Sequence, residues 1–324
     1  DVWQRIRSKL ELTIPENPRV ASQRAWFIKH PSYLNRVAKR AEPFLFYIVE
    51  ALEANDIPVE IALLPIVESA FDPFAYSHGR AAGAWQFIPS TGKHFGLKQN
   101  WWYDGRRDII SSTDAAYTYL AQLNKRFDGD WLLALAAYNA GGGNVSLAIK
   151  RNKRQGKATD FWSLNLPKET MAYVPKLLAI AELIKNAEQY DLALQPISNQ
   201  PYFSAIDTHS QIDLAQAASM AGISTKELYL LNPGFNRWAT APEGPHRLLI
   251  PVEHADQFTQ ALTALPASER VKWTRYKIKS GDSLIAIAKK FETTVGLIRK
   301  TNNINGNSIR AGKTILVPTA SQQA

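Results

Sequence analysis

Apolar residues recur at intervals of three and four along most of the chain up to about Tyr190. The segments "YLNRVAKRAEPFLFYIVEALEAN" (33–55) and "STDAAYTYLAQLNKRF" (112–127) show this spacing, which is typical of amphipathic α-helices. Ser112 or Thr113 is a candidate N-cap of the second helix, and "FDGD" (127–130) can end it. In the next segment, "WLLALAAYNAGGG", we expect the consecutive glycines to end the helix. The pattern therefore predicts an α-rich domain.

The pattern changes after "LALQPISNQP" (192–201), where short β-like runs begin to flank short helices. Residues 276–318 read as strand, turn, helix, turn, helix, loop, strand, which is a βααβ unit. Residues 202–251 match this unit at an offset of 70, and both copies close on an apolar run followed by proline. The aligned pairs are Leu284 with Leu214, Ala288 with Ala218, Ile298 with Leu228 and Asn302 with Asn232. We infer a degenerate repeat and an α+β fold class.

Composition is that of a globular protein of two or three domains, with 324 residues, 45% hydrophobic and 21% charged. No run reaches the roughly 18 to 20 uncharged apolar residues that span a bilayer. The start lacks a Met and a signal-like core, so we expect a soluble fragment whose natural N-terminus lies upstream. The absence of Cys excludes disulfides, thiolate metal sites, a Cys nucleophile and a lipidated Cys within this sequence.

The formal charge of +9 favours an anionic partner, and nucleic acid, cell wall and membrane surface all satisfy that condition. No nucleic-acid-binding signature is found, so we expect no nucleic-acid partner. The basic cluster "KRNKRQGK" (150–157) is interpreted as a solvated loop. No HExxH motif or phosphate-cradling loop occurs and the six His residues are scattered, so neither a metal nor a cofactor is expected.

A single carboxylate, Glu68, follows the most apolar stretch of the chain in "LLPIVESAFDP" (63–73). Pro58 is a plausible helix start, and Pro65 is expected to bend this helix just before Glu68. Apolar neighbours disfavour the charged form of a carboxyl group and raise its pKa. Glu68 is therefore a candidate general acid, although a surface glutamate at a helix end is the commoner case.

Four segments resemble, in order and spacing, the lytic transglycosylase domain related to goose-type lysozyme. They are "ESAFDPFAYSHGRAAGAWQFIPSTGKHFGL", "DGRRDIISSTDAAYTYLAQL", "GDWLLALAAYNAGGGNV" and "ETMAYVPKLLA". The resemblance implies a lysozyme-like fold, peptidoglycan as substrate and Glu68 as catalytic acid and base. It also implies that the substrate-binding residues are Ser77, Gln86, Tyr138, Asn139 and Tyr173, the last of which would position the carboxyl group of Glu68.

Ordinary glycosidases use two carboxylates, and Asp72, Asp104 and Asp108 are the nearest candidates for the second. Their turn-like contexts favour capping or pairing with Arg106 and Arg107 instead. In the family that the chain resembles, the C6 hydroxyl of muramic acid takes the place of the second group and forms 1,6-anhydromuramic acid. The alternatives are a hydrolytic muramidase and, in a different class, a non-catalytic peptidoglycan-binding protein.

Residues 276–318 resemble a LysM domain in "SGDSLIAIAKKF", "IRKTNNI" and "GKTILVP". The resemblance implies a groove for N-acetylglucosamine-containing chains formed by Gly281, Asp282, Ser283, Leu284, Asn307, Ser308 and Ile309. A turn followed by a helix cap at Ser283 is compatible with that role. Residues 202–251 lack the "GD" pair, so a spacer role is as well supported as binding.

The expected organisation is a catalytic domain over 1–197, a LysM-like module or spacer over 198–270 and a LysM domain over 271–324. The resemblance also implies a monomer in the periplasm of a Gram-negative bacterium. Its membrane attachment would be a lipid anchor upstream of this sequence, in the outer membrane.

Overall fold

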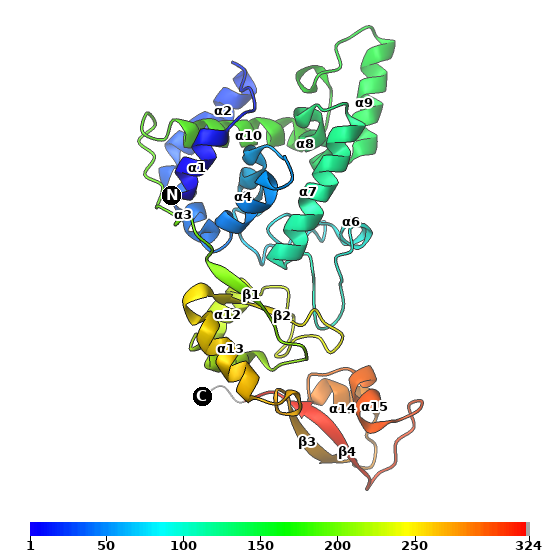
Figure 1. Ribbon diagram of the computed structural model, residues 1–324. Coiled ribbons are helices and arrows are strands. Elements are labelled where there is room, and N and C mark those ends of the chain that lie inside the picture. The colour runs from blue at the N-terminus through cyan, green and yellow to red at the C-terminus, as the bar shows by residue number, and fades with distance from the viewer. Residues whose placement is uncertain (322–324) are drawn as a thin grey trace. The chain divides into compact units, whose positions relative to one another are not determined.

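The computed structural model describes residues 1–321, which form two compact units. Unit 1 contains residues 1–97 and 106–202, and unit 2 contains residues 98–105 and the chain from Phe203 onward (Figure 1). Unit 1 is helical and unit 2 combines short helices with small sheets, so the predicted α+β class is confirmed.

Ten helices make up the described part of unit 1, and the long helix α10 lies at its centre, in contact with α2, α8 and the 3₁₀ segment η1. Most residues of α10 are buried despite an internal proline, Pro175. The helices are α1 (Val2–Lys9), α2 (Pro18–Lys29), α3 (Pro31–Ala41), α4 (Leu45–Glu53), α5 (Leu64–Ser69), α6 (Pro89–His94), α7 (Ile109–Arg126), α8 (Trp131–Ala140), α9 (Gly142–Arg154) and α10 (Lys168–Lys185), with 3₁₀ segments η1 (Val59–Leu63) and η2 (Phe161–Ser163).

Helix boundaries differ from the prediction at three places. Helix α7 begins earlier than expected, because the side chain of Asp108 accepts a hydrogen bond from Ser111 N (2.9 Å) and caps it in place of Ser112 or Thr113. Gly141 ends α8, but Gly142 and Gly143 start α9, so the glycine run separates two helices. The basic cluster at 150–157 was predicted to be a loop, and its first residues instead form the last turn of α9, where cations are favourable.

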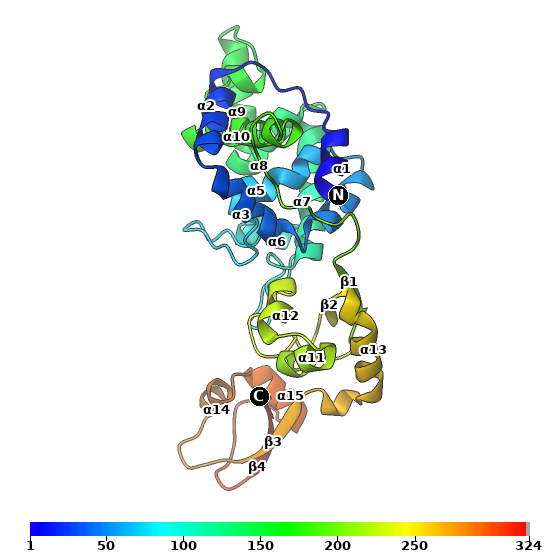
Figure 2. The same cartoon turned by 90° about the vertical axis from the view of Figure 1, so that its left-hand side faces the viewer.

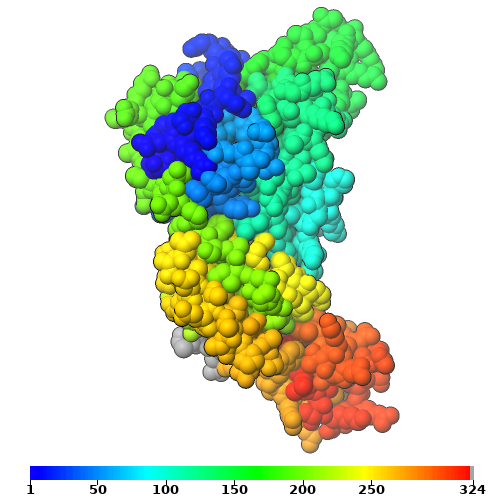
Figure 3. All heavy atoms as spheres, viewed as in Figure 1, coloured from blue at the N-terminus to red at the C-terminus, as the bar shows by residue number. Residues whose placement is uncertain are grey.

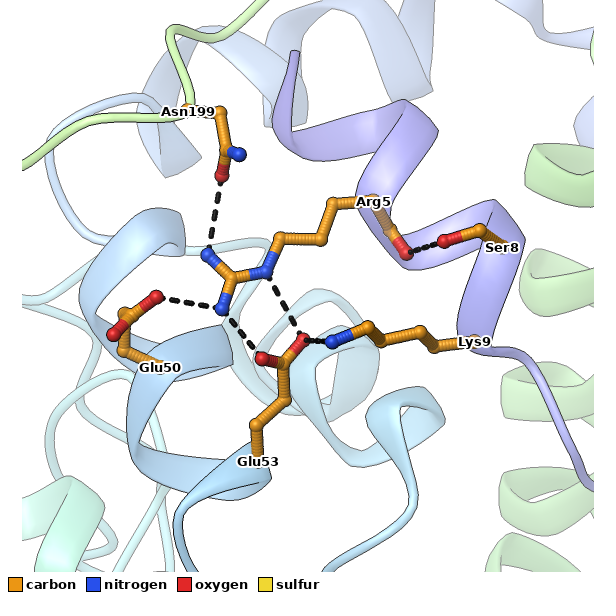
Figure 4. Close-up of polar contacts among 6 residues, drawn as sticks. All are labelled: Arg5, Ser8, Lys9, Glu50, Glu53 and Asn199. Carbon is orange, nitrogen blue, oxygen red and sulfur yellow. Dashed lines mark hydrogen bonds and ion pairs between the residues drawn. The ribbon is translucent and has the colours of Figure 1, made fainter.

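An ion-pair cluster holds α1 against α4 (Figure 4). The guanidinium of Arg5 donates to both carboxylate oxygens of Glu53, at 3.0 and 2.5 Å, and lies 2.6 Å from Glu50. Lys9 also pairs with Glu53 (2.7 Å), and Arg5 donates to the Asn199 side chain (3.1 Å). The bonds from Arg5 lower the pKa of Glu53. The cluster therefore connects the first helix to the segment that follows α10.

Unit 2 repeats one βααβ pattern, as predicted. Each copy has a two-stranded antiparallel sheet, with Phe203 opposite Pro251 in the first and Lys277 opposite Thr314 in the second. The elements are β1 (Phe203–Asp207), α11 (Leu214–Ala221), α12 (Thr225–Leu231) and β2 (Arg247–Pro251), then η3 (Val252–His254), α13 (Ala255–Ala264) and η4 (Ala267–Glu269), and finally β3 (Lys272–Lys277), α14 (Leu284–Lys290), α15 (Val295–Asn302) and β4 (Thr314–Thr319).

The aligned asparagines perform the same task in both copies. Asn232 donates to Leu249 O and accepts from Leu249 N, at 2.9 and 2.8 Å, and so joins the end of α12 to β2. Asn302 makes the equivalent pair of bonds with Leu316, both at 2.7 Å. A side-chain amide can satisfy a strand donor and acceptor together, which explains why both copies have asparagine here.

Helix α13 distinguishes the first copy from the second. It packs against α11 and both strands, and Figure 2 shows it alongside α11. Arg270, which follows it, is buried and donates to the backbone of Thr208 and to the Ser210 hydroxyl in the loop after β1. In the first copy, Arg270 therefore already uses hydrogen-bonding groups of the loop after β1.

The segment 98–105 belongs to unit 2, although it is flanked in sequence by unit 1. Tyr103 forms a β-bridge with Phe235, and Asp104 N donates to Gly234 O (2.7 Å). A Cβ on Gly234 would lie 2.8 Å from the Tyr103 ring, so glycine is required for this close approach. Sequence periodicity gave no indication of this insertion. Within residues 1–321, no helix has the length and apolar character needed to cross a membrane.

Candidate active site

Glu68 lies near the end of α5, a short helix that begins at Leu64 directly after the 3₁₀ segment η1. The single bent helix predicted here was wrong: Pro65 stands in the first turn of α5, where its missing N–H is not needed, so it starts a helix. Ala70 ends α5 in a left-handed conformation (φ 50°). The hydroxyl of Ser69 donates to Ala84 O (2.8 Å) and fixes the following loop over the helix end.

The pKa of Glu68 is raised to about 7, mainly because the carboxyl group is buried. The Tyr173 hydroxyl donates to Glu68 Oε1 (2.5 Å) and acts in the opposite direction, since it stabilises the carboxylate. Glu169 raises the pKa further and Lys176 lowers it, and both effects are smaller than that of burial. The predicted direction of the shift is therefore confirmed, and both the protonated and the charged form of Glu68 are available near neutral pH.

A cleft of about 460 Å³ in unit 1 brings Glu68 together with four of the predicted substrate-binding residues. These are Ser77, Gln86, Tyr138 and Asn139, and they share the cleft with Ile88, Thr91, Tyr119 and Glu169. Tyr173 is buried and is not part of the cleft lining, so its hydroxyl reaches Glu68 from within the protein. This placement fits a positioning residue better than a substrate contact.

The loop between α5 and α6 forms one wall of the cleft through tight backbone turns. Ala81 N donates to the Ser77 hydroxyl (3.0 Å), and the Gln86 side chain donates to Gly83 O (2.8 Å). Gly83 has φ +84°, and a Cβ there would lie 1.9 Å from Arg106 O, so no other residue fits without rearrangement. The loop that carries Ser77 and Gln86 is thus fixed by its own side chains and by close backbone packing.

Tyr138 forms the facing wall from the end of α8. Its hydroxyl donates to Trp85 O (2.7 Å), and its ring contacts the Tyr119 ring at a centroid distance of 5.4 Å. Burial raises the pKa of Tyr138 well above its usual value, so the hydroxyl stays protonated. Trp85 is fully buried and donates to the Thr113 hydroxyl (3.0 Å), which makes it a core residue.

Sequence reasoning missed two charged residues near Glu68, Glu169 and Lys176. Glu169 lines the cleft from the first turn of α10 and accepts a hydrogen bond from the Asn139 amide (3.3 Å). Its position four residues before Tyr173 places both on one face of α10, so helical spacing could have identified it. Burial lowers the pKa of Lys176, while Glu68 acts to raise it.

The aspartates considered for a second carboxylate do not line this cleft. Asp72 accepts from Phe74 N (2.9 Å) in a turn, and Asp108 caps α7, as their sequence contexts indicated. Asp104 lies in the segment that belongs to unit 2. No group of three or more His, Asp or Glu side chains within residues 1–321 could hold a metal ion.

One predicted LysM loop follows β3 and the other precedes β4. They lie at the same end of the sheet, because Ile278 N donates to Lys313 O and Gly312 N donates to Ile278 O, both at 2.8 Å. Asp282 accepts from the Tyr276 hydroxyl (2.8 Å) and Lys279 N (2.7 Å), and Ser283 caps α14. The exposed candidates are Gly281, Ser283, Asn307 and Ser308. Leu284 is buried in the module core and Ile309 packs against it, so both support the loops from below.

Comparisons with known proteins match three parts of the chain to family models. Residues 46–161 match the transglycosylase SLT domain, residues 202–267 the LysM-like domain of lytic transglycosylase MltD and residues 276–318 the LysM domain.

Similar proteins extend the comparison to the whole chain. The lytic transglycosylase Slt of Pseudomonas aeruginosa is 26% identical, covering 46% of this chain and 24% of that one, with a TM-score of 0.34. A putative tributyltin chloride resistance protein of Alteromonas sp. is 38% identical, over 55% of this chain and 86% of its own. Membrane-bound lytic murein transglycosylase D of Escherichia coli K12 is 40% identical over 99% of this chain and 73% of its own length. The chain therefore belongs to the membrane-bound lytic murein transglycosylase D family.

Proposed function

We propose that the protein is a peptidoglycan lytic transglycosylase that cleaves the β-1,4 bond between N-acetylmuramic acid and N-acetylglucosamine and leaves 1,6-anhydromuramic ends. The observation that supports this most directly is a carboxyl group in a cleft whose pKa of about 7 lets it both give and take a proton near neutral pH. Family membership supplies the substrate class.

In the proposed reaction, Glu68 donates its proton to the glycosidic oxygen as the bond to muramic acid C1 breaks. The C6 hydroxyl of the same sugar then forms a bond to C1, and its proton passes to the Glu68 carboxylate, which restores the acid. Because Tyr173 donates to Oε1, we assign both proton transfers to Oε2. The intramolecular hydroxyl has a large advantage over water, with effective molarities on the order of 10⁵ M or more for well-oriented groups.

Neighbouring residues have supporting roles in this proposal. Tyr173 holds the carboxyl group in one orientation, whereas Ser77, Gln86, Tyr138 and Asn139 contact the sugar. The exposed loops of the second βααβ unit are proposed to contact glycan through Gly281, Asp282, Ser283, Asn307 and Ser308. Binding there would raise the effective concentration of the substrate at the cleft.

A hydrolytic muramidase is the second candidate, and one observation favours it: Glu169 places another carboxylate in the cleft lining. In that reading Glu169 would activate water and Glu68 would act as the acid only. Product analysis separates the two. Digestion of purified sacculi should release muramic ends that are lighter by one water and resist borohydride reduction, whereas mainly reducible ends would establish the muramidase.

We further propose that the protein acts in the periplasm as a monomer, attached to the outer membrane by a lipid outside residues 1–324. The support is the name of the similar Escherichia coli protein, which is membrane-bound. The three-domain division at 198 and 271 is likewise a proposal. Fractionation of cells that produce the natural full-length protein tests the anchor, and light scattering tests the oligomeric state.

A further inference from the structure

A second cleft, of about 830 Å³, lies within unit 2 where the two βααβ copies meet. In Figure 3 the first copy runs from lime green to yellow and the second from orange to red, and the bond from the Trp238 indole to Glu292 O joins them. The cleft is lined from the first copy and the 98–105 segment by Trp101, Arg237 and Trp238, and from the second copy by Ile285, Lys289 and Thr293. We call it the inter-module cleft. None of the residues proposed above for glycan contact lines it.

The inter-module cleft presents fixed apolar surfaces. The Trp238 indole is held in place because its N–H donates to Glu292 O (2.9 Å), and Trp238 remains only partly buried. The guanidinium of Arg237 lies 4.0 Å from the centre of the Trp101 ring, and the Tyr229 hydroxyl donates to the backbone carbonyl of Arg237 (2.8 Å). Ile285 is 73% exposed beside these groups. Rigid aromatic and aliphatic faces of this kind suit the C–H face of a pyranose ring.

Two polar atoms in the lining have no hydrogen-bond partner among the described residues. They are the hydroxyl of Thr293, a residue that is only 4% exposed, and Nε of Arg237. Buried polar atoms are nearly always paired, since leaving one unpaired is costly. Both atoms are themselves buried beside the apolar faces of the lining, so a sugar that displaces the lining slightly would supply the partner that each atom lacks.

Charge in the lining favours an anionic ligand. Arg237 and Lys289 contribute two positive groups and Glu292 contributes one negative group, so the charge of the lining is positive on balance. A neutral saccharide would leave the positive groups unused. A glycan with carboxylate substituents pairs with them as well as with the apolar faces.

We propose that the inter-module cleft is an additional saccharide site, which binds a glycan segment bearing carboxylates on its sugars. The site rests on the proposed function in one respect, since the acidic glycan is the muramic-acid-containing strand where it lacks stem peptides. A stem peptide is attached through this carboxyl group as a neutral amide. A ring packs against Trp238 and Ile285, and Arg237 and Lys289 bind a carboxylate. The Thr293 hydroxyl, which is buried in the protein alone, rotates toward the cleft and bonds a sugar hydroxyl. A strand held here and by the exposed LysM-type loops is bound at two places in unit 2.

The test is a titration of the full-length chain, as the Glu68→Gln variant, with a peptide-free tetrasaccharide of alternating N-acetylglucosamine and N-acetylmuramic acid. The indole N–H signals of Trp101 and Trp238, assigned by Trp→Phe substitution, are followed by ¹⁵N NMR. Both should shift, while the signal of Trp3, whose indole donates to Gln195 O, should not. Neutral chitotetraose should bind at these signals more weakly, and equal binding would contradict the carboxylate contact.

Two substitutions with matched controls make the test decisive. Thr293→Val should weaken binding at the Trp238 signal about 5-fold without lowering Tm, because it removes an unpaired buried hydroxyl, whereas Thr293→Ser should bind normally. Lys289→Glu should weaken binding by a similar factor, and Lys300→Glu, the same charge change on an exposed helical lysine outside the cleft, should not.

If Thr293→Val and Lys289→Glu bind as tightly as the parent, or if the two indole signals do not respond, the inter-module cleft is only a packing interface. That result is distinct from failure of the proposed function, which the products of sacculus digestion report independently of this cleft.

Discussion

Glu68 and Asp282 both accept a hydrogen bond from a tyrosine hydroxyl, yet their pKa values move in opposite directions. Tyr173 donates to Glu68 at 2.5 Å in unit 1, and Tyr276 donates to Asp282 at 2.8 Å in unit 2. The pKa of Glu68 is raised to about 7, whereas that of Asp282 is lowered. The tyrosine bond lowers both values, so it cannot be the source of the difference.

Burial accounts for the contrast. Desolvation is the largest influence on Glu68 and exceeds the effect of Tyr173. For Asp282, the leading influence is the bond from Lys279 N, followed by Tyr276, and desolvation is weaker than either. The same hydrogen bond therefore accompanies an acid that can exchange protons near pH 7 in one unit and a turn residue that is charged at neutral pH in the other. Glu68 is therefore suited to catalysis, whereas Asp282 stabilises the loop that contains it.

Replacing the buried carboxyl group has the largest expected effect. Glu68→Gln should lower kcat by about 10³-fold or more, because general acid and base catalysis are lost together. Circular dichroism and sacculus binding should remain unchanged. Asp72→Asn, a carboxyl change outside the cleft, should retain activity close to the parent, and retention of near-parental activity by a folded Glu68→Gln protein would remove Glu68 from the mechanism.

The same substitution should alter stability in a pH-dependent way. A carboxyl group whose pKa is raised by folding favours the fold while it is protonated, and this contribution disappears as pH rises from the unfolded value, near 4.3, through about 7. Glu68→Gln should therefore be more stable than the parent at pH 8, on the order of 3–4 kcal/mol, and close to equally stable at pH 4. Urea unfolding at both pH values measures this, and an equal difference at the two would contradict the shifted pKa.

The turnover rate should depend on pH, and this is the next largest effect that we expect. Because the acid form of Glu68 starts the reaction, the rate should fall about tenfold per pH unit above about 7. Glu169 raises the pKa of Glu68, so Glu169→Gln should move this alkaline limb to lower pH. Initial rates on soluble glycan between pH 5 and 9 measure the limb. If the rate instead begins to fall above about pH 4.5, the pKa of Glu68 is not raised by desolvation.

The smallest effects come from removing the two tyrosine hydroxyls. Tyr173→Phe should move the alkaline limb above pH 7, and Tyr276→Phe should raise the pKa of Asp282 toward its ordinary value, because each hydroxyl stabilises a carboxylate. Tyr276→Phe should leave turnover of soluble glycan unchanged and weaken sacculus binding by a few fold at most. If the two substitutions shifted the pKa values of Glu68 and Asp282 in opposite directions, the claim that each hydroxyl stabilises its carboxylate would be wrong.

Much of this arrangement could be predicted from sequence. The apolar run before Glu68 predicted its raised pKa, and helical and βααβ patterns predicted the fold class. The segment "ETMAYVPK" also contains Glu169 four residues before Tyr173, so helical spacing could have predicted its position as well. Local pattern could not reveal that Pro65 would start α5 instead of bending it, since both are compatible with a proline in an apolar helix.

Features that depend on distant contacts were not predictable in this way. The assignment of 98–105 to unit 2 depends on Tyr103 meeting Phe235 and Gly234, which are far away in sequence. The bond from the Trp238 indole to Glu292 O likewise joins residues of the two copies that are 54 positions apart. Periodicity describes one element at a time, so neither contact leaves a local trace in the sequence.

The most direct test is to measure both carboxyl pKa values in one sample. A ¹³C NMR titration of the side-chain carboxyl signals, with Glu68 and Asp282 assigned from their Gln and Asn variants, reports each group separately. We expect a midpoint near 7 for Glu68 and one below the ordinary aspartate value for Asp282. A midpoint for Glu68 near 4.3, the value of an unperturbed glutamate, would contradict the claim that burial prepares this group for catalysis.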